Sequence, residues 1–151
     1  MGQPRLSEYC PDFVDIDYGG VTITGYAEDF IEVEYEDDDF KKTVGALGDV
    51  TRTRQLNRSG KITVTLMDAS PSNDALMLFA LVDRRSGSGF KPFFMRDRSS
   101  NTIVKATQTW IMKIPKVNRK KESSTTQWVF EAAFIEIIIG GSVLPSSISA
   151  G

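Results

Sequence analysis

Histidine is absent from this chain, and its 151 residues include a single cysteine, Cys10. The absence of histidine removes the Ser–His and Cys–His pairs of nucleophilic catalysis and the commonest general base. One cysteine without a histidine cannot supply the usual ligands of zinc or copper, and it cannot form a disulfide within the chain. We therefore predict a protein that is not an enzyme and binds no cofactor, and a lone thiol fits a reducing cytoplasm.

Long apolar runs are also missing. The longest, residues 132–139, is interrupted by Glu136 and is far shorter than the roughly 20 residues that cross a bilayer. A composition of 40% hydrophobic and 25% charged residues is typical of a soluble globular protein. The length suits one domain with its own core. We predict a single domain over residues 1–151 with an N-terminal arm (1–11), a flexible C-terminal tail (142–151) and no membrane partner.

Charge is unevenly distributed along the chain. The first 40 residues carry twelve acids against one base, Arg5, whereas residues 41–151 carry a net charge of +9. This division has two compatible interpretations: the two parts pair within one fold, or oppositely charged surfaces attract neighbouring copies. Asp37, Asp38 and Asp39 could ligate a hard cation, but their run lacks the glycine and the terminal glutamate of an EF-hand loop. We therefore predict no metal site.

Hydrophobic periodicity predicts several strands and one helix. Residues 61–67 alternate with a period of two, as a half-buried strand does. In residues 30–36 the same period places Phe30 with the glutamates on one face, and in residues 102–114 it places Val104 in phase with Ile114. Ser70 precedes Pro71 as an N-cap precedes a first-turn proline, so a helix is expected to follow. The predicted fold is mainly β, a sandwich or barrel with one flanking helix.

Residues 37–59 are predicted to form a long, glycine-spaced loop. Unlike most polar loops, this one carries large apolar side chains among its arginines, a combination often found in interaction elements. We expect it to contact a neighbouring subunit or ring; the alternative is an ordinary surface loop. The candidate contact residues are Phe40, Val44, Leu47, Arg52, Arg54, Leu56 and Arg58.

The same part of the chain carries a family resemblance. An acidic strand is followed by D-D-F-K-K-T-V-G-A-L-G-D-V-T-R, by S-G-K-I-T-V-T-L and by S-P-S-N-D-A-L. This order resembles the tail-tube (inner tube) proteins of contractile-tailed bacteriophages. The resemblance extends over residues 12–141 and is closest in residues 30–81. It implies a β-sandwich subunit whose strands join those of its neighbours in hexameric rings, which stack into the hollow tube through which phage DNA is ejected.

The resemblance also implies partners and a location. The partners would be further copies of the chain, the tail sheath protein, and the baseplate and tail-terminator proteins, in a virion tail assembled in the host cytoplasm. A tube lumen must let DNA slide, and basic walls bind DNA through counterion release. We therefore expect Glu32, Glu34 and Glu36 to face the lumen, without sequence-specific DNA binding. Their competing role is to pair with bases of an adjacent subunit.

Two alternatives remain open from sequence. One is a tube protein of a bacterial contractile injection or type VI secretion system. The other is a small β-barrel that binds a nucleic acid or a protein, because residues 113–121 are strongly basic. Single-strand binders also need aromatic stacking residues among the bases, and this segment has none. Contact of the basic segment with an acidic neighbour is therefore the favoured interpretation.

Overall fold

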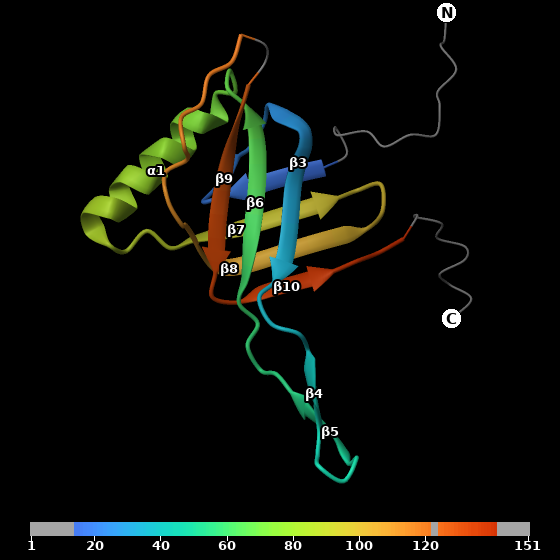
Figure 1. Cartoon of the computed structure of the whole chain (residues 1–151). Coiled ribbons are helices and arrows are strands. Elements are labelled where there is room, and N and C mark those ends of the chain that lie inside the picture. Colours follow the sequence, from blue (N-terminus) through green and yellow to red (C-terminus); the bar gives the residue numbers. More distant parts are fainter. Residues whose placement is uncertain (1–13, 122–123, 142–151) are drawn as a thin grey trace, which may run out of the picture.

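The computed structural model describes residues 14–121 and 124–141 (Figure 1). The predicted N-terminal arm (1–11) and C-terminal tail (142–151) therefore lie outside the described residues. One large antiparallel sheet forms most of the fold, with the strand order β2-β1-β7-β8-β9-β6-β3 and β10 paired to β8. The described elements are β1 Val14–Tyr18, β2 Val21–Thr22, β3 Tyr26–Tyr35, β4 Phe40–Val44, β5 Val50–Arg54, β6 Gly60–Met67, α1 Ser72–Ser86, β7 Lys91–Asp97, β8 Thr102–Ile111, β9 Thr125–Ala132 and β10 Ile135–Ile138.

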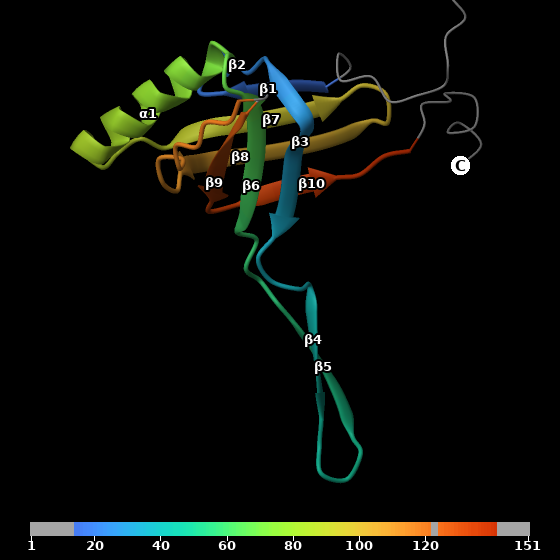
Figure 2. The same ribbon diagram turned by 45° about the horizontal axis from the view of Figure 1, so that its top comes forward.

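The sheet curls into a half-barrel. In both ribbon views β9, β6 and β3 run across the direction of β1, β7, β8 and β10, and α1 lies at one side of the curl (Figures 1 and 2). The curl is centred on β8, which pairs with β10 through its first half and with β9 through its second. The predicted mainly β fold with one flanking helix is confirmed.

The core lies inside this curl. Three aromatic rings meet there: the centroid of Phe130 lies 4.9 Å from that of Tyr18 and 5.6 Å from that of Phe93. The predicted alternation of β6 is confirmed, since Ile62, Val64 and Leu66 are all buried. Burial of a large apolar side chain stabilises a fold by about 1.5–3 kcal/mol, so these strands supply much of the folding free energy.

The predicted phase of β8 is wrong beyond Ala106. Between the pairs Phe93–Ala106 and Lys91–Thr109, β8 contains one residue more than β7. Such a bulge inverts the alternation of the side chains that follow it. Thr109 and Ile111 are therefore buried, whereas Gln108 and Met112 are exposed, and the strand ends at Ile111 rather than Ile114.

Two further expectations need correction. Phe30 is buried and stacks on Tyr26 at a centroid distance of 4.7 Å, although the alternation of residues 30–36 placed it with the exposed glutamates. The reason is a register shift against β6 between Tyr26 and Ile31. The helix N-cap is Pro71 rather than Ser70. The Ser70 hydroxyl accepts a hydrogen bond from the Ser72 N–H at 3.2 Å and donates one to the Thr24 carbonyl at 2.6 Å, and so ties the helix start to the sheet.

The bulge in β8 leaves one polar atom without a partner. Within the described residues, the buried Thr109 hydroxyl makes no hydrogen bond, although the carbonyl of the same residue accepts one from the Tyr18 hydroxyl at 3.2 Å. A buried polar group without a partner retains its desolvation penalty, typically 1–3 kcal/mol.

We predict that Thr109→Val raises the free energy of unfolding by about 1 kcal/mol, because valine keeps the shape of the side chain and removes the unpaired hydroxyl. Chemical denaturation of the isolated subunit measures this change. Thr107→Val, at an exposed position of the same strand, is the matched control and should change stability by less than about 0.5 kcal/mol. Destabilisation by Thr109→Val would mean that the hydroxyl is paired in solution.

Candidate assembly surfaces

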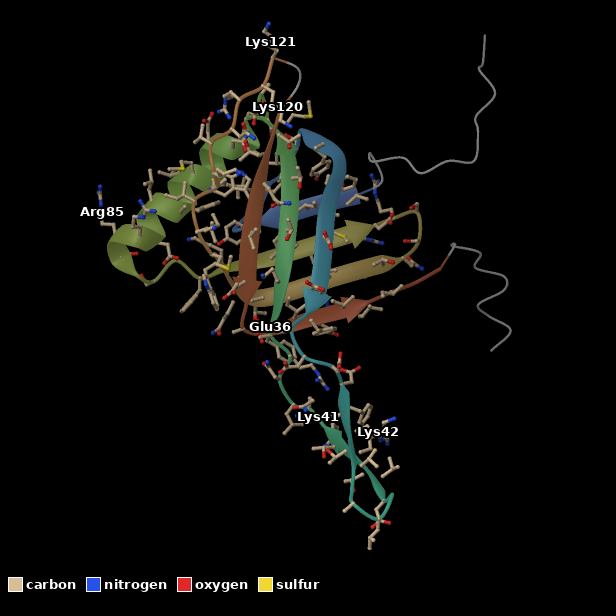
Figure 3. All side chains as sticks on the ribbon, viewed as in Figure 1. Glu36, Lys41, Lys42, Arg85, Lys120 and Lys121 are labelled. Atoms are coloured by element: carbon tan, nitrogen blue, oxygen red, sulfur yellow. The ribbon has the colours of Figure 1, made fainter. Side chains whose placement is uncertain are left out.

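The acidic strand β3 presents two of the three predicted lumen residues on its outer face. Glu32 and Glu34 are exposed, while the intervening Val33 packs against the core. Glu36 follows the end of the strand, where the chain leaves the sheet (Figure 3), and its carboxylate accepts a hydrogen bond from the Ser59 hydroxyl at 3.0 Å. The structure therefore groups Glu32 with Glu34 and sets Glu36 slightly apart from them.

The outer face of β3 continues across two neighbouring strands. Glu34 lies opposite Lys61 on β6, and Lys61 lies opposite Glu131 on β9. Glu32 lies opposite Thr63. We call this outer face the acidic wall. It carries three acids, Glu32, Glu34 and Glu131, and one base, Lys61. Glu131 was not among the predicted residues, because the pairing of β9 with β6 joins segments about seventy residues apart.

β3 also forms one edge of the sheet. It pairs with β6 along one side, and within residues 14–121 and 124–141 no strand pairs with its other side. An edge strand presents a row of unpaired backbone N–H and C=O groups, which makes it a template for pairing with another chain. With ten residues, β3 is long for a strand left at an edge.

The predicted loop of residues 37–59 is largely a β-hairpin instead. β4 and β5 pair with each other only and form a separate two-stranded sheet (hereafter the arm) that projects away from the half-barrel (Figure 2). All ten of its strand residues are exposed. The candidate contact residues remain accessible, and Leu47 at the tip is 92% exposed. The strands were missed because neither is buried, so no contrast between core and solvent marks them.

Polar contacts hold the arm at its root. The Arg58 guanidinium lies 3.6 Å from the Asp39 carboxylate, and the Asn57 amide donates a hydrogen bond to Asp37 at 2.9 Å. The backbone N–H of Gln55 donates to the carbonyl of Asp39 at 2.8 Å. Arg58 thus belongs to the root of the arm, whereas Arg52 and Arg54 lie along its length.

The last part of the basic segment (residues 113–121) lies at the opposite end of the molecule from the arm, as Lys120 and Lys121 show (Figure 3). Asp68 anchors it. The Asp68 carboxylate accepts hydrogen bonds from the hydroxyls of Ser124 and Thr126, the latter at 2.6 Å, and lies 3.4 Å from the Arg119 guanidinium. These two hydroxyls, with a smaller contribution from Arg119, hold the pKa of the Asp68 carboxyl below its usual value.

Two other kinds of feature are missing from the described residues. No three or more acidic or cysteine side chains there are grouped as metal ligands would be. No helix among them has both the length and the apolar character needed to span a bilayer. The surfaces that stand out in this part of the chain are therefore the acidic wall, the open edge of β3, the arm and the basic segment.

Solved tube and tube-cap proteins share this fold. A chain of the tube-terminating cap of the anti-feeding prophage matches with a TM-score of 0.60 at 11% identity, covering 92% of this chain and 97% of that one. A chain of the sheath–tube complex of PVC, an extracellular contractile injection system, also gives 0.60 at 9% identity, covering 89% and 94%. The curled half-barrel with one helix is therefore a fold that this chain shares with chains of tube assemblies.

Sequence comparison then identifies the family. Residues 16–140 match the family described as "Bacteriophage PhiTE tail tube protein". "Structural protein ORF10" of Pseudomonas phage KPP10 is 30% identical over 147 residues, which cover 91% of this chain and 85% of that protein. The chain belongs to the phage tail tube family, and the resemblance expected from the motif order is confirmed. Its relatives are structural proteins.

The lowered pKa of Asp68 predicts how stability depends on pH. Because the folded-state pKa lies below the unfolded one, the contribution of Asp68 is present above the unfolded value, near 4, and is lost as the pH falls through the folded value. We predict that Asp68→Asn lowers the melting temperature at pH 6 and has a progressively smaller effect below pH 4. Melting curves of both proteins from pH 6 to pH 2.5 measure the difference. A difference that does not change with pH would show that folding does not favour the ionised form of Asp68, and would contradict the prediction.

Proposed function

We propose that this protein is the inner-tube subunit of a phage tail, which assembles into hexameric rings that stack into the tube through which DNA is ejected. The observation that carries the proposal is the open edge of β3 along residues 31–35, which among the described residues pair with β6 on one side only. Pairing between that edge and a neighbouring copy satisfies the free backbone groups. A head-to-tail contact of this kind closes into a ring when the rotation between copies permits it.

The exposed arm is the observation that favours stacking of the rings. It projects from the half-barrel as a separate hairpin with exposed Phe40, Val44 and Leu47. An isolated two-stranded hairpin is at best marginally stable in water, so burial against a second copy would stabilise it. We propose that the arm contacts an adjacent subunit or ring in the assembled tube.

Partners beyond the chain itself follow from the assemblies of similar proteins. The solved relatives come from structures described as a sheath–tube complex and a tube-terminating cap. By analogy, we propose that a tail sheath surrounds this tube and that baseplate and terminator proteins close its ends, with assembly in the host cytoplasm. A tube of a contractile injection system is the second candidate, favoured by those solved structures; the phage relative favours a virion.

Electron microscopy of the purified protein tests the assembly directly. We expect rings at moderate protein concentration and stacked rings or tubes at high concentration, with an increase in light scattering. Class averages of end-on views would give the number of subunits in each ring. A protein that stays monomeric over a wide range of concentration and salt would contradict the proposal.

The acidic wall supports a lumen role for Glu32, Glu34 and Glu36. These glutamates are exposed, and an acidic or neutral surface does not hold DNA phosphates by counterion release. The nearest base on the wall is Lys61, which lies opposite Glu34 and Glu131. We propose that this face lines the channel.

Replacing all three glutamates with lysine should leave the fold intact and slow DNA ejection at least about threefold, since a basic lining binds phosphates. Single-particle fluorescence of ejecting phage measures the rate. Glutamine at the same three positions is the control and should eject at close to the normal rate. Lysine particles that assemble and eject normally would reject the lumen role, and particles that fail to assemble would point to ion pairs between subunits.

A further inference from the structure

The arm has two chemically different faces. Residues directly opposite each other on paired strands project from the same face, and successive residues alternate between faces. The register of β4 with β5 pairs Phe40 with Arg54, Lys42 with Arg52 and Val44 with Val50, which together form one face (the cationic face). The opposite face (the threonine face) consists of Lys41, Thr43, Thr51 and Thr53.

All the apolar strand residues and three of the four strand cations thus lie on the cationic face. Figure 3 shows Lys41 and Lys42, neighbours in sequence, on opposite sides of the arm. Burial does not account for this segregation, since all ten strand positions are exposed. The aromatic ring of Phe40 and the two arginines, Arg52 and Arg54, are of residue types that are enriched in contact surfaces.

The cationic face is partly ordered in advance. The Arg52 guanidinium lies 4.1 Å from the centre of the Phe40 ring, a cation–π contact that restricts the arginine without using its N–H donors. The planar guanidinium remains able to bind a carboxylate with two parallel hydrogen bonds. Less side-chain entropy is then lost when a partner binds.

The same face carries an unfavourable pair. Lys42 lies directly opposite Arg52, and like charges at opposite positions destabilise a strand pair. Among the described residues, no carboxylate forms an ion pair with Lys42, Arg52 or Arg54; the one salt bridge near the arm joins Arg58 to Asp39 at its root. A partner that brings carboxylates to this face would relieve the repulsion. The arrangement therefore favours an acidic partner over a neutral one.

We propose that the cationic face docks on a carboxylate-bearing surface of a second copy of this chain, while the threonine face makes no contact that depends on charge. The inference rests on the proposed function and specifies which face of the arm forms the contact. The second copy has the required charge, since its first 40 residues hold twelve of the twenty acids in the chain. A docking contact of this kind weakens as salt rises.

Two neighbouring lysines provide a matched test. Lys42→Glu and Lys41→Glu change the net charge equally, one on each face. We expect Lys42→Glu to raise the protein concentration needed for tube formation at least about fivefold and Lys41→Glu to leave it within about twofold. Light scattering and electron microscopy give that concentration. Equal melting temperatures for the two variants and the unchanged protein would confirm that the fold is retained, because the arm lies outside the core.

Carbodiimide coupling, which joins lysine amines to carboxylates in direct contact, identifies the partner surface. We expect Lys42 to couple to an Asp or Glu of another copy, and Lys41 not to do so. Mixing unlabelled protein with protein labelled with nitrogen-15 separates links between copies from links within one copy. The carboxylate found by mass spectrometry would define the docking surface.

The outcomes separate this inference from the proposed function. Tubes that form with both variants equally, or fail equally, would overturn the inference and leave the tube function intact. Coupling of Lys42 only within its own chain would also overturn it. If the unchanged protein never forms rings, the proposed function fails. Coupling of Lys42 between copies would still support the docking contact in that case, and the absence of such coupling would exclude the contact.

Discussion

The open edge of β3 is the constraint on which the proposed assembly depends. The central strand β8, by comparison, pairs with three neighbours, β7, β9 and β10. Within residues 14–121 and 124–141, β3 instead ends the sheet, and proteins usually shorten, cover or distort such edges to prevent unwanted pairing. The shift between Tyr26 and Ile31 distorts its first half, but the second half is regular, and there the exposed Glu32 and Glu34 lie. The acids keep that face in water while leaving the edge able to pair.

Charge separation follows the same geometry. The acids of the first 40 residues lie largely on β1, β3 and the root of the arm, whereas cations occupy the length of the arm and residues 113–121. Lys41 and Lys42 lie at one end of the molecule and Lys120 and Lys121 at the other (Figure 3). A subunit with basic ends and an acidic side is suited to contacts with its own copies. Pairing within one fold is also present, since Asp39 with Arg58 and Asp15 with Arg98 join acids of the first 40 residues to later bases.

Sequence analysis succeeded where burial imposes a period on the chain. The alternation of residues 61–67 and the helix after Pro71 were predictable because each buries one face. It failed where tertiary pairing overrides the period, as in β8, where one extra residue brings Thr109 rather than Gln108 into the core. Of the candidate surfaces, the sequence located the acidic strand and the arm. Glu131 and the two faces of the arm were not predicted, because both depend on strand register. The register of β9 with β6 joins distant segments, and no local pattern specifies the register of an exposed hairpin.

A cryo-electron microscopy map of the assembled protein, at a resolution that shows backbone hydrogen bonds, tests the central claim most directly. If the open edge drives assembly, the free side of β3 pairs with a strand of the adjacent copy, and Glu32 and Glu34 face the channel. A map in which subunits meet through other surfaces, with the edge of β3 left in solvent, would contradict it.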